Sequence, residues 1–175
     1  MQFFFGPVMF DEPEYRADGP AFTFAPLITQ PQSRGSVSLR SADPRDLAAV
    51  TPNYLECPTD VGALVHGIRL ARELASTAAF RPFRGQELAP GDSVTSDADL
   101  AAYARKACST VWHPAGTCKM GRDREAVVDP GLRVHGVDGL RVADASVMPR
   151  ITSGNTNAPT IVIAERASDL LTAHP

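Results

Sequence analysis

The chain has 175 residues, the length of one ordinary domain or of two small ones, and its 43% hydrophobic and 21% charged residues are typical of a globular protein. Its 17 basic and 20 acidic side chains give a formal net charge of −3, and no basic run is long enough to bind a phosphate backbone, so no nucleic-acid partner is expected. The 15 prolines and 13 glycines predict many turns and few long helices.

The first segment, residues 2–10, is apolar but lacks a basic leader and is interrupted by Pro7, so we expect a strand and not a targeting signal. A core strand at the very start indicates a chain that begins in the middle of a fold. Segments 22–29 and 35–40 are short, rich in β-forming residues and bounded by turn residues, which predicts further antiparallel strands.

A helix is predicted to open at Asp60, just after Pro58, because apolar residues then recur at spacings of three and four. These residues are Val61, Leu64, Val65, Ile68, Ala71 and Leu74. His66 lies off this stripe and is expected at the surface. A connector rich in proline, glycine and serine follows over 81–96, and a second helix is expected over 97–107.

Beyond Val111, short apolar pieces alternate with turns, which predicts strands at 126–128, 132–134 and 140–143. The connector 134–139 contains Asp-Gly, a pair typical of hairpin turns. A final helix is expected with Asn157 as its N-cap and Pro159 in its first turn. The side chains predicted to pack this helix on a sheet are Ile161, Ala164, Ala167, Ser168 and Leu171.

No stretch approaches the roughly 18 consecutive apolar residues that cross a bilayer, so no transmembrane segment is expected. Cys57, Cys108 and Cys118 are odd in number and have no Cys-x-x-Cys spacing, which argues against a disulfide framework and a structural zinc site. Reduced thiols suit a reducing compartment, and the expected location is the cytoplasm.

The densest group of potentially reactive residues is 112–121, where two glycines, a proline and His113 share one segment. Such a segment is predicted to be a shaped loop that presents His113, because loops on a rigid scaffold often carry catalytic groups. Neutral imidazole accepts a proton near pH 7, so His113 is a candidate base. The alternative is a structural histidine bonded to the backbone.

Other chemistries at this loop are weaker predictions. A Cys118 thiol paired with His113 lacks a third, orienting group, and a metal site of His113, Cys118 and His135 lacks a ligand spacing. The chain also contains no Gly-x-Gly, so the phosphate-binding turn of a dinucleotide fold is missing.

A second cluster, residues 153–160, leads into the final helix. The free N–H groups and the positive dipole end of that helix would favour an anion or a developing negative charge. The alternative is that Asn157 is only a helix cap.

In this order, the two clusters resemble the C-terminal signature of the glucose-methanol-choline (GMC) family of FAD-dependent oxidoreductases, and most of all its choline-dehydrogenase-like branch. The matching segments are 113–121, 127–130, 132–136, 139–146, 148–149 and 154–160, and the upstream segments 31–35, 41–44 and 52–55 resemble its substrate domain.

The resemblance implies oxidation of a primary alcohol to an aldehyde. His113 would be the base that takes the hydroxyl proton while a hydride passes to the flavin, and Asn157 would hold the substrate oxygen. The FAD cofactor would lie against the residues Asp144, Ala145, Asn157, Ala158, Pro159 and Thr160.

The implied fold is α+β: an antiparallel sheet with flanking helices over 1–110 as the substrate-binding part, and over 111–175 the active-site loop and the C-terminal return segment of the FAD domain. The N-terminal Rossmann part of the family is absent. The chain therefore resembles the C-terminal portion of such an enzyme, with the missing N-terminal half as its partner if the enzyme is split. The alternative is an inactive fragment or subunit that binds no FAD on its own.

Overall fold

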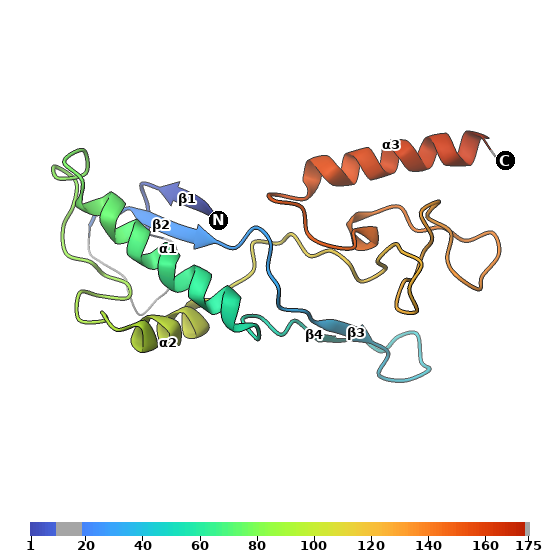
Figure 1. Cartoon of the computed structure of the whole chain (residues 1–175), viewed down its shortest axis with the longest axis horizontal. Coiled ribbons are helices and arrows are strands. Elements are labelled where there is room, and N and C mark those ends of the chain that lie inside the picture. Colours follow the sequence, from blue (N-terminus) through green and yellow to red (C-terminus); the bar gives the residue numbers. More distant parts are fainter. Residues whose placement is uncertain (10–18, 174–175) are drawn as a thin grey trace. The chain divides into compact units, whose positions relative to one another are not determined.

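The computed structural model describes residues 1–9 and 19–173. The described chain contains helices and short antiparallel strands joined by long irregular segments, which confirms the predicted α+β class (Figure 1). Two compact units emerge, one of residues 1–34 and 53–109 and one of residues 35–52 and 110–175. Segment 35–52 groups with the C-terminal unit. The assignment of 1–110 to the substrate-binding part and of 111–175 to the FAD domain stays a prediction.

The first unit contains a two-stranded antiparallel sheet, β1 (Gln2–Gly6) and β2 (Thr23–Leu27), in which Phe5 lies opposite Phe24. Both strands are shorter than the predicted 2–10 and 22–29, and residue 10 lies outside the described residues. The Phe5 and Phe24 rings cluster with those of Phe22 and Phe80, at centroid distances of 5.0 Å for Phe5–Phe24 and 5.2 Å for Phe24–Phe80. This aromatic cluster joins the sheet to the segment that follows α1 (Pro58–Ser76).

Helix α1 starts two residues earlier than predicted, because Pro58 occupies its first turn, where a missing N–H costs nothing. The predicted stripe is confirmed: its members Val61, Val65 and Ile68 are buried. The exposed side chain of His66 is confirmed as well. Gly67 allows close packing on the sheet, since a Cβ there would come within 2.6 Å of the Pro26 Cβ.

Helix α2 (Asp97–Ala107) is confirmed over the predicted range, and the Ser96 side chain caps it by accepting from the Asp99 N–H. Leu100 and Ala104 of α2 pack on α1 to form the buried cluster of this unit. The predicted connector between the helices contains only turns, and the Arg72 guanidinium binds both Glu87 carboxylate oxygens to hold it against α1.

Asp60 is a buried carboxylate that the apolar pattern did not single out. Its two oxygens accept from the Gln32 N–H at 2.9 and 3.1 Å, and Oδ2 also accepts from the Ser33 N–H and hydroxyl at 2.8 and 2.5 Å. Burial opposes ionisation, but these bonds and the nearby Arg34 charge outweigh it, and the pKa of Asp60 is lowered. Asp60 thereby ties the 31–34 segment to the first turn of α1.

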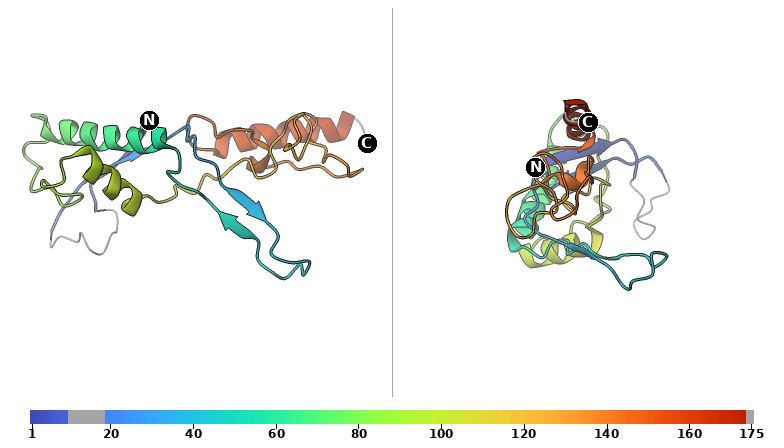
Figure 2. Two further views of the ribbon diagram at one scale, coloured as in Figure 1. Left: turned by 60° about the horizontal axis from the view of Figure 1, so that its bottom comes forward. Right: turned by 90° about the vertical axis from the view of Figure 1, so that its right-hand side faces the viewer.

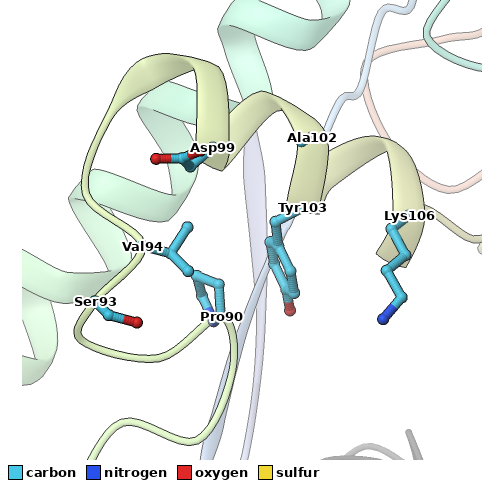
Figure 3. A pocket seen from close by; sticks show the side chains of 7 residues that line it. All are labelled: Pro90, Ser93, Val94, Asp99, Ala102, Tyr103 and Lys106. Carbon is cyan, nitrogen blue, oxygen red and sulfur yellow. The ribbon is translucent and has the colours of Figure 1, made fainter.

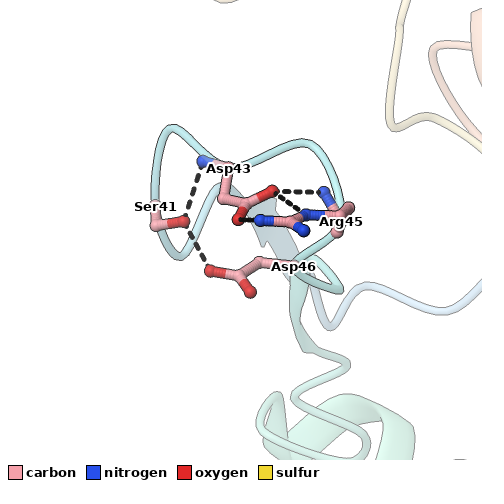
Figure 4. A network of polar contacts seen from close by, with 4 residues as sticks. All are labelled: Ser41, Asp43, Arg45 and Asp46. Carbon is pink, nitrogen blue, oxygen red and sulfur yellow. Dashed lines mark hydrogen bonds and ion pairs between the residues drawn. The ribbon is translucent and has the colours of Figure 1, made fainter.

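The second unit contains a separate hairpin, β3 (Ser36–Ser38) and β4 (Ala49–Thr51), so β3 does not join β1 and β2 in the single sheet expected from the sequence (Figure 2). Its connecting loop is held by its own side chains, as Figure 4 shows. Arg45 donates to both Asp43 oxygens, and the Ser41 hydroxyl donates to Asp46 at 2.5 Å.

The three strands predicted beyond residue 125 are replaced by single bridges, which join Val128 to Met120 and Val134, and Arg133 to Arg141. Each apolar piece is too short to extend a ladder before the next turn. The predicted turn over 134–139 is present, with φ of +77° at Gly136 and +75° at Gly139. The buried cluster of this unit is formed by Val128, Leu132, Val147 and Ala167.

Helix α3 (Asn157–Ala173) confirms the final predicted helix but packs through a different face. Ala167, Ile163 and Leu170 contact the buried cluster of the second unit. Of the predicted packing residues, only Ala167 is buried, and the side chains of Ile161 and Leu171 are about half exposed, at 54% and 55%. The packing face therefore consists of Ile163, Ala167 and Leu170, and it shares only Ala167 with the predicted stripe.

Candidate active site

The loop that carries His113 is fixed by main-chain hydrogen bonds to distant segments. Cys118 N–H donates to the Ser146 carbonyl at 3.0 Å, and Met120 N–H donates to the Val147 carbonyl at 2.8 Å. Both acceptors belong to the short 3₁₀ helix η2 (Ala145–Val147), whose Val147 side chain is fully buried. The predicted shaped loop is thus present, and it is anchored to the core of the second unit.

Two residues give this loop its shape. Gly116 has a φ of +90°, and a Cβ there would lie 3.2 Å from the Met148 carbonyl oxygen, so both backbone conformation and space favour glycine. Trp112, immediately before the histidine, also has a left-handed φ of +60° and an 80% exposed side chain. These turns on either side keep His113 out of any helix or strand.

The imidazole of His113 is half-buried and contacts the residue just before α3. Its Nδ1 lies 3.1 Å from the Thr156 hydroxyl oxygen and 3.4 Å from the Thr156 main-chain nitrogen, whose N–H donates to it. Thr156 is only 6% exposed. The structure therefore brings the two clusters singled out in the sequence together, although they are 43 residues apart.

Asn157 is the first residue of α3 and not its N-cap, which corrects the predicted start by one residue. Thr156 occupies the cap position, and its carbonyl accepts from the Thr160 N–H at 3.0 Å and the Thr160 hydroxyl at 2.7 Å. Asn157 and Ala158 are exposed, whereas Pro159 and Thr160 are half-buried. The side-chain amide of Asn157 makes no hydrogen bond to any residue that the structure describes.

Asp144 and Ala145 lie at the start of η2. The Asp144 carboxylate caps η2 by accepting from the Ser146 N–H at 2.7 Å. Hydrogen bonds from the Ser146 side chain and main chain hold the pKa of Asp144 below its ordinary value, so the group stays ionised at neutral pH. An ionised carboxylate accepts hydrogen bonds from hydroxyl groups and repels phosphate.

Cys118 and His135, the other residues considered for chemistry, have separate surroundings. The His135 Nε2 lies 3.1 Å from the Gly121 carbonyl oxygen, and the Cys118 thiol is half-buried and not in a disulfide. Across residues 1–9 and 19–173, no three His, Cys, Asp or Glu side chains are grouped as metal ligands. Burial raises the pKa of the Cys108 thiol, in the first unit.

Two hollows in the surface lie away from these residues. One, of about 390 Å³, is an open depression between α2 and the preceding loop, lined by Pro90, Ser93, Val94, Asp99, Ala102, Tyr103 and Lys106 (Figure 3). Another, beside α1, is lined by His66 and the Arg69–Asp97 ion pair. Neither contains a predicted site residue, so the candidate site rests on the contact between His113 and Thr156.

The sequence profile of the GMC oxidoreductase family matches residues 31–164. The chain belongs to this family. A mitochondrial choline dehydrogenase of the mouse, Mus musculus, is 50% identical over 82% of this chain and 24% of its own length. An alcohol dehydrogenase [acceptor] of Pseudomonas putida is 41% identical over 98% of this chain and 31% of its own length.

The fold of this GMC family member also matches solved structures. A formate oxidase of Aspergillus oryzae, studied for the modification of its FAD, superposes with a TM-score of 0.83 and 30% identity over 94% of this chain and 28% of its own. The resemblance to a C-terminal portion is thus confirmed, and the chain spans about a quarter to a third of the length of the relatives it matches. None of the described helices is long and apolar enough to cross a membrane.

Thr156 is the residue of this site that the sequence did not reveal. It precedes the segment from Asn157 to Thr160, which the family resemblance places beside the cofactor. Threonine is a common residue at the N-cap of a helix. A threonine before a helix is common, and only folding shows that a histidine 43 residues earlier lies against it.

Proposed function

We propose that the chain contributes the substrate side of an FAD-dependent oxidation of a primary alcohol to an aldehyde. Membership of the GMC family supports the reaction class. Relatives named as choline dehydrogenase and alcohol dehydrogenase support a small alcohol as substrate. The observation that carries the proposal is the contact of His113 with Thr156, which places the histidine beside the start of α3.

His113 and Asn157 would act on the same substrate oxygen. The Asn157 amide, exposed at the first position of α3, can donate to that oxygen and hold it. His113 would bind the hydroxyl group and take up its proton, which neutral imidazole can do near pH 7. Removing this proton favours oxidation, because an alkoxide releases its α-hydride more readily than an alcohol does.

The residues present fit the FAD cofactor of the family. The first turn of α3 has no acidic residue, and the N–H groups of Asn157 and Ala158 have no partner inside the helix, so this end suits an electron-rich ring. Pro159 and Thr160 lie in the same turn, and Asp144 with Ala145 would accept a ribityl hydroxyl. When bound, FAD supplies the hydride acceptor.

A specific observation favours a second candidate, a chain that binds no FAD on its own. Large apolar side chains are exposed in the second unit, including Leu39 at 87% and Leu47 at 85% between β3 and β4, and Val162 at 66% on α3. In this candidate the N-terminal part of a GMC enzyme, on another polypeptide, is the partner.

For both candidates we propose the cytoplasm, where the three free cysteines stay reduced.

The experiment starts with purified residues 1–175 and measures flavin absorbance, alone and after co-expression with the N-terminal portion of the Pseudomonas putida relative. We expect flavin absorbance and oxidation of primary alcohols, choline included, from the co-expressed pair. His113→Ala should lower turnover by about 10² to 10⁴, the usual contribution of a proton-transfer group.

His66→Ala, on the exposed face of α1, is the matched histidine control and should leave turnover unchanged. Full turnover by a flavin-loaded pair that carries His113→Ala would contradict the proposed role of His113 as the base. Residues 1–175 that are colourless alone but carry flavin when co-expressed with the N-terminal portion would favour the second candidate. A colourless and inactive pair would contradict both candidates.

A further inference from the structure

We propose that Thr156 sets the tautomer of His113, so that the neutral ring keeps a lone pair on Nδ1 and its hydrogen on Nε2. Thr156 is a positioning residue in this proposal, since it acts through His113. The tautomer follows from the contacts of the two residues, and its consequence for catalysis rests on the proposed function.

Two groups of Thr156 face the same ring nitrogen. The hydroxyl oxygen is 3.1 Å from Nδ1 and the main-chain nitrogen is 3.4 Å from it. A hydroxyl can donate or accept a hydrogen bond, but a main-chain N–H can only donate. The N–H aimed at Nδ1 therefore requires a lone pair there, and the neutral ring must carry its hydrogen on Nε2.

The fold prevents Thr156 from turning this N–H elsewhere. The Thr156 carbonyl is held by the N–H and hydroxyl of Thr160, in the first turn of α3. The Thr156 N–H has no other hydrogen bond among the described residues, and Thr156 is buried. With hydrogen on Nδ1, two N–H groups would face each other and a buried donor would lose its acceptor, which is unfavourable.

The ring nitrogen left for a ligand is then Nε2, which makes no hydrogen bond to any residue the structure describes. As Nε2–H, it donates to the oxygen of a bound alcohol. Before Nε2 can take up the hydroxyl proton, the ring must change to the opposite tautomer: Nε2 releases its hydrogen to solvent, Nδ1 takes one from solvent, and Nδ1–H then donates to the Thr156 hydroxyl. The hydroxyl can reverse its role in this way, whereas the main-chain N–H cannot, so the Thr156 hydroxyl couples the tautomer of the ring to proton uptake.

The test is nuclear magnetic resonance of the full chain labelled with ¹⁵N-histidine, at about pH 9, well above the reference histidine pKa of about 6.5. The chain has four histidines, so the His113 signals are identified by their loss in His113→Asn. We expect Nδ1 to resonate as an unprotonated nitrogen and Nε2 as a protonated one. The reverse pattern, or equal averaging of the two, would overturn the assignment.

Two variants test the part played by the side chain. Thr156→Ser keeps both donors and should leave the Nδ1 resonance in place. Thr156→Val keeps the main-chain N–H but removes the hydroxyl, so Nδ1 should stay unprotonated while its resonance moves toward that of a nitrogen with a weaker hydrogen bond. An unchanged resonance in Thr156→Val would show that the hydroxyl does not bind the ring.

A separate arm uses the flavin-loaded pair. There, Thr156→Val should lower kcat by roughly tenfold or more with little change in KM, because Nδ1–H lacks an acceptor during proton uptake, and Thr156→Ser should restore kcat. Equal kcat for Thr156→Val and the wild type would overturn the coupling. The resonance data need no activity, so they stand even where the proposed function fails.

Discussion

Single side chains hold the segments of this protein in place through contacts between residues distant in sequence. Asp60 binds Ser33 across 27 residues and His113 binds Thr156 across 43. The loop that presents His113 could be predicted, because glycine and proline exclude a helix within it. The partners of His113 and Asp60 could not, since nothing in the local pattern specifies which of many polar residues returns to meet them.

Asp60→Asn should destabilise the first unit by about 1–3 kcal/mol at pH 7, because the new amide directs N–H groups at the donors of Gln32 and Ser33. The folded pKa of Asp60 is below its ordinary value, so this stabilisation is present above the ordinary value and is lost as pH falls through the folded one. The difference between wild type and variant should therefore shrink below about pH 4.

Urea unfolding followed by helical circular dichroism, at pH 7 and at acid pH, measures both effects. Asp92→Asn, at an exposed position in the connector, is the matched control and should stay within about 0.5 kcal/mol of wild type. A variant difference that persists undiminished in acid would contradict the ionised state of Asp60.

At the scale of elements, the helices were more predictable than the strands. Apolar spacing and start signals predicted the range of α2 correctly, the start of α3 to within one residue and the start of α1 to within two. The strand pairings depend on partners elsewhere, so β3 paired with β4 and the pieces beyond residue 125 formed only single bridges. The packing face of α3 was predicted correctly only at Ala167, because apolar side chains occur on several sides of the helix and their spacing alone does not select one face.

The same substitution at a buried and at an exposed alanine of α3 tests which side of the helix is packed. Ala167→Leu should cost about 1–3 kcal/mol, because the 5% exposed site in the second cluster has no room for a larger side chain. Ala164→Leu, exposed on the same helix, should stay within about 0.5 kcal/mol of wild type. Thermal unfolding of the two purified variants measures these changes in stability. Equal losses of stability would support the packing face predicted from the sequence.

At the scale of the whole molecule, each compact unit has its own buried cluster. Leu100 is fully buried in the first and Val128 is fully buried in the second. This organisation was not evident from composition, because both units draw on segments that are discontinuous in the chain. Two separate cores suggest two units that open separately.

Leu100→Ala should destabilise the first unit by about 2–5 kcal/mol and speed hydrogen exchange in α1 and α2, with exchange at Gly121 unchanged. Val128→Ala should produce the opposite pattern, since the Gly121 N–H donates to the Val128 carbonyl in the second unit. Mass spectrometry of exchanged peptides gives the readout. Uniform acceleration in both units by either variant would show a single cooperative unit.

The two loops described above differ in how their shape could change during evolution. The loop of Ser41, Asp43, Arg45 and Asp46 is closed by contacts among its own residues, so it can be replaced as one block without altering the rest of the chain. The loop of His113 is shaped by bonds from Cys118 and Met120 to η2, which lies more than twenty residues further on. A change in the shape of the His113 loop therefore requires matching changes in η2. A single substitution in the loop must fit both the turns of the loop and its hydrogen bonds to η2.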